Sequence, residues 1–152
     1  MEYSNRPVAR VLDNSVEALA RYDYPGLIGV EAATAYWGLS TYNPQMPIFL
    51  INDDTLDHDG YFARCALSIL FVPDVNRDNI VKLSQNLSIT NREQTICDMI
   101  RYNRHEFHLF EAVLSAYEDG EVDIERLENM AEQYDILDRL HQIYEEASEE
   151  LN

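Results

Sequence analysis

The chain has 152 residues and a mass of 17.6 kDa, and 46% of its residues are hydrophobic, which is typical of one folded domain with a packed core. It carries 28 acidic and 11 basic residues, so its net charge is −17 at pH 7. This charge disfavours direct contact with nucleic acid or an anionic membrane and favours a basic protein partner, and the sequence contains no apolar run of the ~20 residues that a bilayer requires.

The N-terminal part of the chain predicts two helices separated by a turn. Residues 8–21 place apolar side chains at helical spacing, so we expect residues 1–23 to contain an N-terminal helix. The Tyr24-Pro25-Gly26 segment predicts a turn, because proline fixes φ and glycine permits positive φ. Residues 31–37 predict a short, alanine-rich helix that ends at Gly38.

Three short strands are predicted after this helix. Residues 47–51 and 65–72 are continuously apolar and are each followed by turn-forming residues, and residues 87–89 form a third, shorter candidate. Continuous apolarity indicates burial of both faces of a strand. The first two strands should therefore bury five side chains, those of Ile48, Leu50, Leu67, Ile69 and Phe71.

The remainder of the chain predicts helices. Thr90 and Glu93 fit a capping box, in which the threonine hydroxyl accepts a backbone N–H and the glutamate returns the bond. A second helix should cover residues 107–117 and end at residues 118–120. From residue 123 onward the apolar spacing is helical, with a phase slip near Asp135 that predicts two further helices.

These elements predict the α+β class, with a small, mostly buried β-sheet followed by a C-terminal helical bundle. We expect residues 1–152 to form a single domain. Its parts are the N-terminal helix at 1–23, a helix plus the small sheet at 24–90, and a helical part at 91–152.

Patterns of metal and nucleophile chemistry are weak. His105 and His108 are three residues apart on a predicted helix, but no third ligand stands at an informative spacing, so a half-buried pair is the simpler interpretation. Cys65 and Cys97 show no Cys/His cluster and are expected to be buried thiols of a reducing compartment. With no secretory signal visible at the start, we expect a cytoplasmic protein.

The carboxylates that follow the first strand are the other candidate for catalysis. Asn52-Asp53-Asp54 comes directly after an apolar run, and Asp57 and Asp59 follow, a pattern that resembles Mg²⁺ sites and nucleases. Such nucleases often need a lysine for the scissile phosphate, but Lys82 is the only lysine of the sequence. We therefore expect a protein that is not an enzyme and that has no cofactor and no metal.

Over half of the net charge lies in residues 118–152, which contain 13 acidic and 2 basic residues. Five carboxylates recur there beside the apolar stripe, at spacings of 3, 4, 3 and 3: Glu125, Glu128, Glu132, Asp135 and Asp138. Like charges at such spacings destabilise a helix by about 0.2–0.5 kcal/mol per pair. These five residues are the predicted partner-binding site for a basic protein, while a plain solvated face and a mimic of DNA charge remain open.

Residues 24–51 resemble the core of the AbiEi-type antitoxins of bacterial abortive-infection (type IV toxin–antitoxin) systems. In that family a Pro-Gly turn leads to a small-residue helix of the form SALYLHGL, followed by Ser or Thr and then an apolar strand. The matching features here are Pro25-Gly26, Ala32-Ala33, Gly38-Leu39-Ser40 and residues 48–51.

A second stretch resembles the family's ERTLLD pattern at the opening of a helix. Glu93, Thr95, Ile96 and Asp98 match it in register, while the arginine of the pattern is Gln94 here. The similarity spans roughly residues 24–140. Too few residues precede it for the winged helix-turn-helix that the family usually carries, so we expect that domain, and direct DNA binding, to be lacking.

The resemblance implies a non-catalytic antitoxin-like protein that neutralises a nucleotidyltransferase-type toxin, encoded nearby, of a bacterial or phage abortive-infection system. The acidic helices would then meet the basic surface of that toxin. The alternative is an acidic interaction protein that acts as an anti-defence inhibitor or as a nucleic-acid charge mimic.

Overall fold

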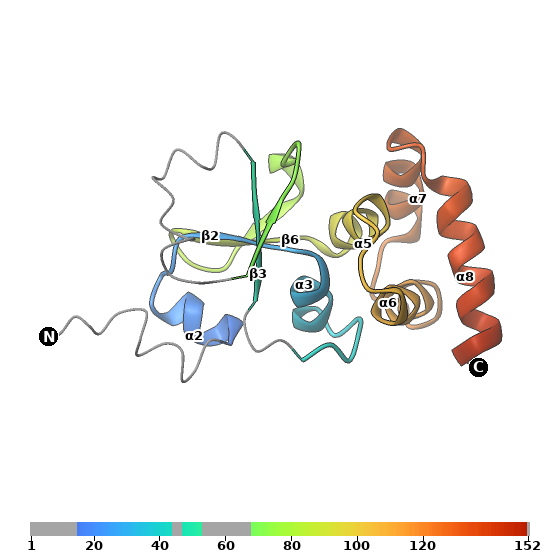
Figure 1. The fold of residues 1–152 in the computed structure, drawn as a ribbon, viewed down its shortest axis with the longest axis horizontal. Helices are drawn as coiled ribbons and strands as arrows, with labels where there is room; N and C mark the ends of the chain where they lie inside the picture. The colour runs from blue at the N-terminus through green and yellow to red at the C-terminus, as the bar shows by residue number, and fades with distance from the viewer. Residues whose placement is uncertain (1–14, 44–46, 53–67, 152) are drawn as a thin grey trace, which may run out of the picture. The chain divides into compact units, whose positions relative to one another are not determined.

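The computed structural model describes residues 15–43, 47–52 and 68–151 (Figure 1). These residues belong to two compact units. Unit 1 comprises the described parts of Met1–Ile28 and Pro44–Ile89, and unit 2 comprises Gly29–Asn43 and the described part of Thr90–Asn152. Strands in unit 1 and a C-terminal helical region in unit 2 confirm the α+β class. The predicted single domain stays a prediction.

Unit 1 is built on a five-stranded sheet with the order β4-β3-β2-β6-β5. Its elements are α2 (Val16–Arg21), β2 (Gly26–Ile28), β3 (Ile48–Ile51), β4 (Ser68–Phe71), the 3₁₀ turn η2 (Arg77–Asn79), β5 (Ile80–Lys82) and β6 (Leu87–Thr90). Strand β2 pairs with β6 in parallel and with β3 in antiparallel orientation, and β3 pairs with β4 in parallel. The sequence predicted β3, β4 and β6 but missed the three-residue strands β2 and β5.

The centre of this sheet follows the apolar pattern. All four residues of β3 are buried, as continuous apolarity predicts, and Ile48 and Leu50 are 7% and 3% exposed. The ring of Phe49 is fully buried and meets the edge of the Tyr24 ring at 6.5 Å between centroids. Leu87 and Ile89 of β6 are also fully buried. The core of unit 1 therefore lies on β3 and β6.

The prediction of a buried strand at residues 65–72 is wrong for the described part of that strand. Ile69 is only partly buried, and Phe71 is 64% exposed. The physical reason is that β4 is an edge strand of the described sheet, with β3 as its one neighbour in that sheet. Leu67 lies outside the described residues.

The predicted turn at Tyr24-Pro25-Gly26 is also misplaced, because Gly26 already begins β2. The chain turns at Tyr22 and Asp23 instead, where Asp23 takes a positive φ of 54°. Ser84 Oγ and the Asn86 backbone N–H each donate to Asp23 Oδ1 at 2.7 Å. These hydrogen bonds lower the pKa of Asp23 below its ordinary value and tie the turn to the start of β6.

The helix predicted at residues 8–21 is α2 in its described part. Its N-cap is Ser15, whose side chain accepts a hydrogen bond from the Ala18 N–H at 3.1 Å. Residues 8–14 lie outside the described residues. Ser15 thus marks the beginning of α2.

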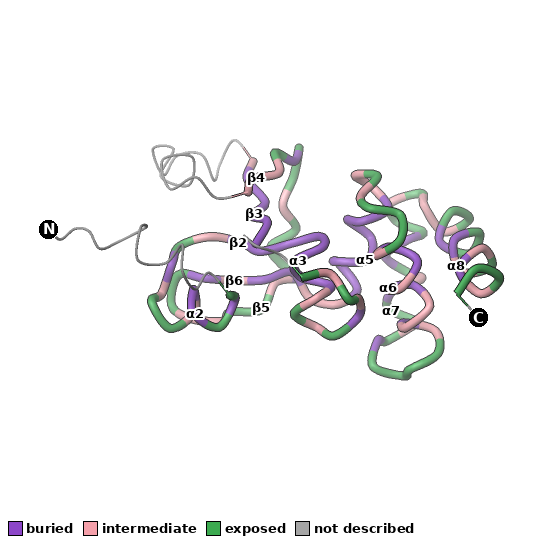
Figure 2. Tube along the Cα trace, turned by 60° about the horizontal axis from the view of Figure 1, so that its bottom comes forward, coloured by how far each residue is buried: buried purple, intermediate pink, exposed green. Residues whose placement is uncertain are grey.

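Unit 2 consists of five helices within the described residues: α3 (Val30–Tyr36), α5 (Arg92–Arg101), α6 (Glu106–Glu118), α7 (Ile124–Gln133) and α8 (Leu137–Leu151). Helix α5 is central, since it packs against α3, α6 and α7, while α8 packs against α6 and α7. Every residue of α5 from Glu93 to Ile100 is buried, as the purple tube in Figure 2 shows. The core of unit 2 therefore forms around α5.

The capping box predicted for α5 is wrong. Its N-cap is Asn91, whose Oδ1 accepts from the Gln94 N–H at 2.8 Å. Thr90 is still the last residue of β6, so the cap falls on the next residue. Glu93 does not return to the cap: its Oε2 accepts from the Asp123 N–H, at the N-terminus of α7, at 3.1 Å.

The predicted ends of the other helices are confirmed. Gly38, two residues after α3, has φ +76°, and Gly120, between α6 and α7, has φ +78°. The break expected near Asp135 separates α7 from α8, and Asp135 itself has φ 61°. Within the residues that the structure describes, none of the helices has both the length and the hydrophobicity to cross a membrane.

Candidate functional site

The predicted site lies on α7, on the turn after it and on the start of α8. We call Glu125, Glu128, Glu132, Asp135 and Asp138 the acidic strip. Four of its residues are exposed, and Glu128 is intermediate. The opposite side of α7 is apolar and buried, with Leu127 fully enclosed. The apolar pattern therefore turns the acidic strip outward, as expected.

Glu128 differs from the rest of the strip, because its carboxylate joins three helices. Glu128 Oε2 accepts from the Tyr117 hydroxyl of α6 at 2.5 Å and contacts His141 Nε2 of α8 at 2.9 Å. Both contacts lower the pKa of Glu128, and the hydrogen bond from Tyr117 has the larger effect. Burial, followed by the contact with Glu128, raises the pKa of Tyr117. Glu128 is therefore an inter-helix contact as well as a surface carboxylate.

The other four carboxylates of the strip are uncommitted. Within the described ranges, no hydrogen bond or ion pair involves the side chains of Glu125, Glu132, Asp135 or Asp138. Asp138 lies in the first turn of α8, where the helix dipole favours a negative charge. Four carboxylates of the strip can therefore contact a partner without first breaking a hydrogen bond or ion pair within the described residues.

The basic residues of unit 2 do little to neutralise this surface. The sequence of unit 2 contains 18 acidic and 5 basic residues. Arg101 Nη1 lies 3.1 Å from Asp98 Oδ1, and Arg104 Nε donates to Glu31 Oε1 at 2.9 Å. Arg92 lies over the indole ring of Trp37 at 4.3 Å. Three of the five guanidinium groups therefore serve the packing of unit 2.

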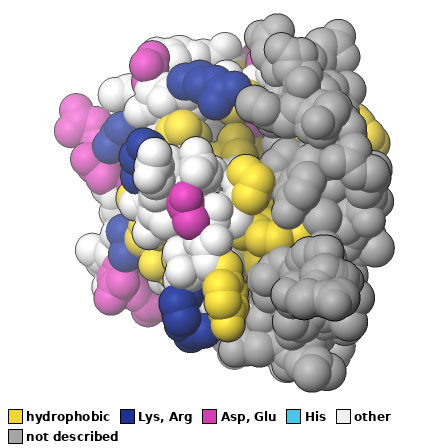
Figure 3. All heavy atoms as spheres, turned by 90° about the vertical axis from the view of Figure 1, so that its left-hand side faces the viewer, with side chains coloured by type: hydrophobic (Ala, Val, Ile, Leu, Met, Phe, Trp, Pro, Cys, Tyr) yellow, Lys and Arg dark blue, Asp and Glu magenta, His cyan; other side chains and the backbone are white. Residues whose placement is uncertain are grey.

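Unit 1 is less unbalanced, with 10 acidic and 6 basic residues in its sequence. On the face of the molecule drawn in Figure 3, Lys and Arg side chains lie among Asp and Glu side chains. The excess negative charge is therefore concentrated in unit 2, which also carries the acidic strip.

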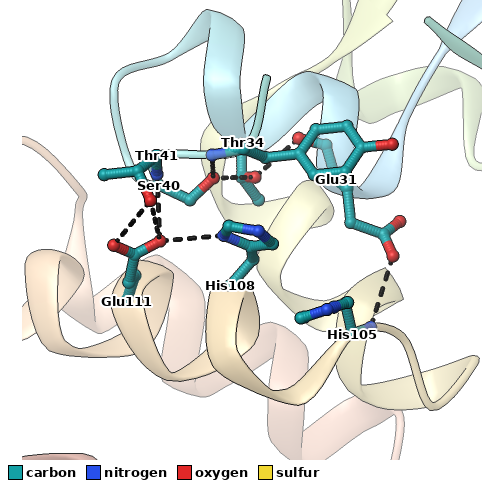
Figure 4. A network of polar contacts seen from close by, with 8 residues as sticks. Glu31, Thr34, Ser40, Thr41, His105, His108 and Glu111 are labelled. Carbon is teal, nitrogen blue, oxygen red and sulfur yellow. Dashed lines mark hydrogen bonds and ion pairs between the residues drawn. The ribbon is translucent and has the colours of Figure 1, made fainter. Parts of the chain in front are cut away.

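A polar network that sequence reasoning missed connects α6 to the segment after α3 (Figure 4). Glu111 accepts from the Thr41 backbone N–H at 2.9 Å and from the Thr41 hydroxyl at 2.9 and 3.0 Å. His108 Nδ1 lies 2.9 Å from Glu111 Oε1. Partial burial would raise the pKa of Glu111, but the bonds to Thr41 and His108 outweigh it and lower that pKa. Only the three-residue spacing of His108 and Glu111 hinted at this contact.

The same network fixes the turn that leaves α3. The Thr34 hydroxyl donates to the Glu31 carbonyl at 2.7 Å and contacts Ser40 Oγ at 2.8 Å. Ser40 Oγ in turn accepts from the Tyr42 N–H at 3.2 Å. Hydroxyl groups thereby hold the segment from Gly38 to Tyr42 in a defined conformation.

The histidine pair belongs to this network. The rings of His105 and His108 lie 4.8 Å apart, and His108 is 16% exposed at its side chain, whereas His105 is exposed. Among the residues with a described position, no group of three or more His, Cys, Asp or Glu side chains is arranged to hold a metal ion. His108 is linked to the rest of the network by its contact with Glu111.

The remaining candidates for reactive groups are the cysteine thiols and the carboxylates that follow β3. Cys97 is fully buried, and burial raises the pKa of its thiol to about 12, which suits an inert side chain. Cys65 and the carboxylates of Asp53, Asp54, Asp57 and Asp59 lie outside the described residues.

The residues that match the ERTLLD pattern are architectural in this structure. Glu93, Thr95 and Asp98 are all at least 93% buried. Glu93 caps the start of α7, and Thr95 Oγ1 donates to the Asn91 carbonyl at 2.6 Å. Asp98 accepts from Gln94 Nε2 at 2.8 Å. The motif therefore organises the centre of unit 2 and does not form its surface.

Comparison with known proteins gives no assignment, since neither the protein-family models nor the curated proteins contain a match to this chain. The similarity to the AbiEi-type antitoxins therefore stays a prediction.

Proposed function

We propose that this protein is a non-catalytic, antitoxin-like protein that binds and neutralises a nucleotidyltransferase-type toxin of an abortive-infection system in the cytoplasm. The observation that carries the proposal is the exposed acidic strip with its four uncommitted carboxylates. The motif resemblance described above supports the choice of toxin, because it extends over residues of both units.

The acidic strip suits a basic partner for two physical reasons. Opposite fields steer diffusional encounter, and they do so most strongly where one sign of charge is concentrated. Uncommitted carboxylates also lose no internal hydrogen bond when they meet Lys or Arg, whereas Glu128 would have to leave Tyr117 and His141. A toxin that transfers nucleotides handles a negatively charged substrate and would have a basic substrate surface, and covering that surface would block its substrate.

The test compares two variants that change the charge by the same amount. The strip variant carries Glu125→Lys, Glu132→Lys and Asp138→Lys. The matched control carries Glu145→Lys, Glu149→Lys and Glu150→Lys, three exposed positions on α8 outside the strip. Association with the protein encoded by the neighbouring gene is measured by stopped flow at two salt concentrations.

We expect the strip variant to associate at least about tenfold more slowly at low salt, and its association rate to depend less on salt. The control variant should stay within about threefold of the wild type, because charges outside the interface act on association only through the long-range field. An association rate of the strip variant equal to that of the control would contradict the proposal. Capture of a restriction or defence protein in place of the toxin would favour the anti-defence alternative.

A further inference from the structure

Unit 2 contains a cleft of about 340 Å³ that the proposed function does not use. It lies between the segment that follows α3 and the C-terminal ends of α6 and α8, and one of its walls is the Thr41–Glu111 contact of Figure 4. This volume is near the lower end of the ~300–1,000 Å³ of ligand pockets, so the cleft fits one long side chain and not a large cofactor.

The lining of the cleft includes three carboxylates that hold hydrogen bonds. Glu111 is fixed by Thr41, and Asp119 Oδ2 accepts from the Ser115 hydroxyl at 2.7 Å. Glu118 Oε2 accepts from the Tyr144 hydroxyl at 3.4 Å. The second oxygens of Glu118 and Asp119 have no partner within the described residues, and no Lys, Arg or His lines the cleft.

Three leucines line the cleft together with the carboxylates, which separates this cleft from a purely acidic surface. They are Leu39, Leu114 and Leu151, and Leu151 is 36% exposed. A ligand must therefore present an aliphatic segment to the leucines and a cation to the carboxylates. Lys and Arg side chains have this division, since their stems pack on apolar surface while their heads stay polar.

We infer that the cleft binds the side chain of an arginine from a protein partner. Arginine suits it better than lysine, because the planar guanidinium presents five donors in a fixed fork, and two exposed carboxylates that are neighbours in the sequence, Glu118 and Asp119, both line the cleft. The inference rests on the proposed function in taking the partner to be basic. It adds a defined anchor at a place distinct from the acidic strip.

The experiment titrates ¹⁵N-labelled protein with acetyl-arginine amide and, in parallel, with acetyl-citrulline amide, which has the same shape but no charge. We expect saturable shifts of the amide signals of Ser40, Thr41, Ser115 and Asp119 with the arginine derivative alone. The Glu118→Gln, Asp119→Asn variant should bind about tenfold more weakly, as expected for loss of a charge-assisted pair. Glu111 stays unchanged in it because Glu111 anchors Thr41.

The matched control is Glu145→Gln, Glu149→Gln, which removes two exposed carboxylates of α8 that do not line the cleft and should bind like the wild type. Equal shifts with citrulline, or wild-type affinity of the cleft variant, would overturn the inference. The strip variant described above should keep the arginine-induced shifts. Loss of toxin binding in the strip variant alone would therefore leave the cleft inference standing, and loss of the shifts alone would leave the proposed function standing.

Discussion

The ion pair between Glu31 and Arg104 should be a sensitive point of unit 2. Glu31 is buried in α3 with 7% of its side chain exposed, and Arg104 Nε reaches its Oε1 at 2.9 Å. The His105 N–H donates to the other oxygen at 3.3 Å. Replacing Arg104 by methionine would remove the guanidinium and leave the buried Glu31 carboxylate with the backbone N–H of His105 as its donor.

The expected magnitude follows from the exposure of the two partners. Breaking a fully buried pair costs about 3–5 kcal/mol, and exposed pairs contribute about 0–1 kcal/mol. Because 26% of the Arg104 side chain is exposed, water can reach the carboxylate, and we expect Arg104→Met to lose about 2 kcal/mol. For a chain of this length that corresponds to a fall in Tm of about 4–8 °C.

The assay is urea unfolding followed by the fluorescence of Trp37, the single tryptophan, which lies in unit 2. The control is the double variant Arg104→Met, Glu31→Gln, which removes the stranded charge and should recover part of the loss. A free energy of unfolding of Arg104→Met within about 0.5 kcal/mol of the wild type would show that the Glu31–Arg104 pair does not stabilise unit 2, as would a double variant no more stable than the single one.

Three further predictions concern the cap, the thiol and acid stability. Asn91→Ala should lose about 1 kcal/mol in urea unfolding, while Asn91→Asp should match the wild type, because aspartate caps equally well. In a Cys65→Ser background, Cys97 should stay unreactive toward a disulfide reagent at pH 8 until the protein unfolds, since burial raises its pKa to about 12. Glu111 and Glu128 have folded pKa values below the ordinary 4.5, so their stabilisation should be complete above that pH and fall as the pH drops through the folded values. Urea midpoints from pH 6 to pH 3 should therefore fall less steeply in Glu111→Gln than in the wild type.

The sequence predicted those parts of the fold that depend on local apolar spacing. The strand at 48–51, the helix ending near Gly38 and the break at Asp135 all follow from patterns within a few residues. Burial of a strand depends on its place in the sheet as well. β3 and β4 have similar apolar runs, but within the described sheet β3 has neighbours on both sides and β4 is at the edge, a difference set by strand order.

Polar contacts were harder to predict, because they join residues far apart in the sequence. Thr41 and Glu111 are 70 positions apart, and neither carries a local signal of the contact. The prediction of the N-cap of α5 failed for a different reason, since Thr90 and Asn91 are both good capping residues. The choice between them depends on where β6 ends, and Thr90 still belongs to that strand.

Glu128 shows why spacing alone cannot define a binding surface. The sequence spacing grouped Glu128 with Glu125 and Glu132 on one side of a helix, and the structure places all three residues on α7. A residue at the edge of a helix face, however, can contact a neighbouring helix. Glu128 lies where Tyr117 and His141 reach it from α6 and α8, so a change there would alter helix packing and partner binding together. The strip variant therefore leaves Glu128 in place, and any effect on association rate then reports on the uncommitted carboxylates alone.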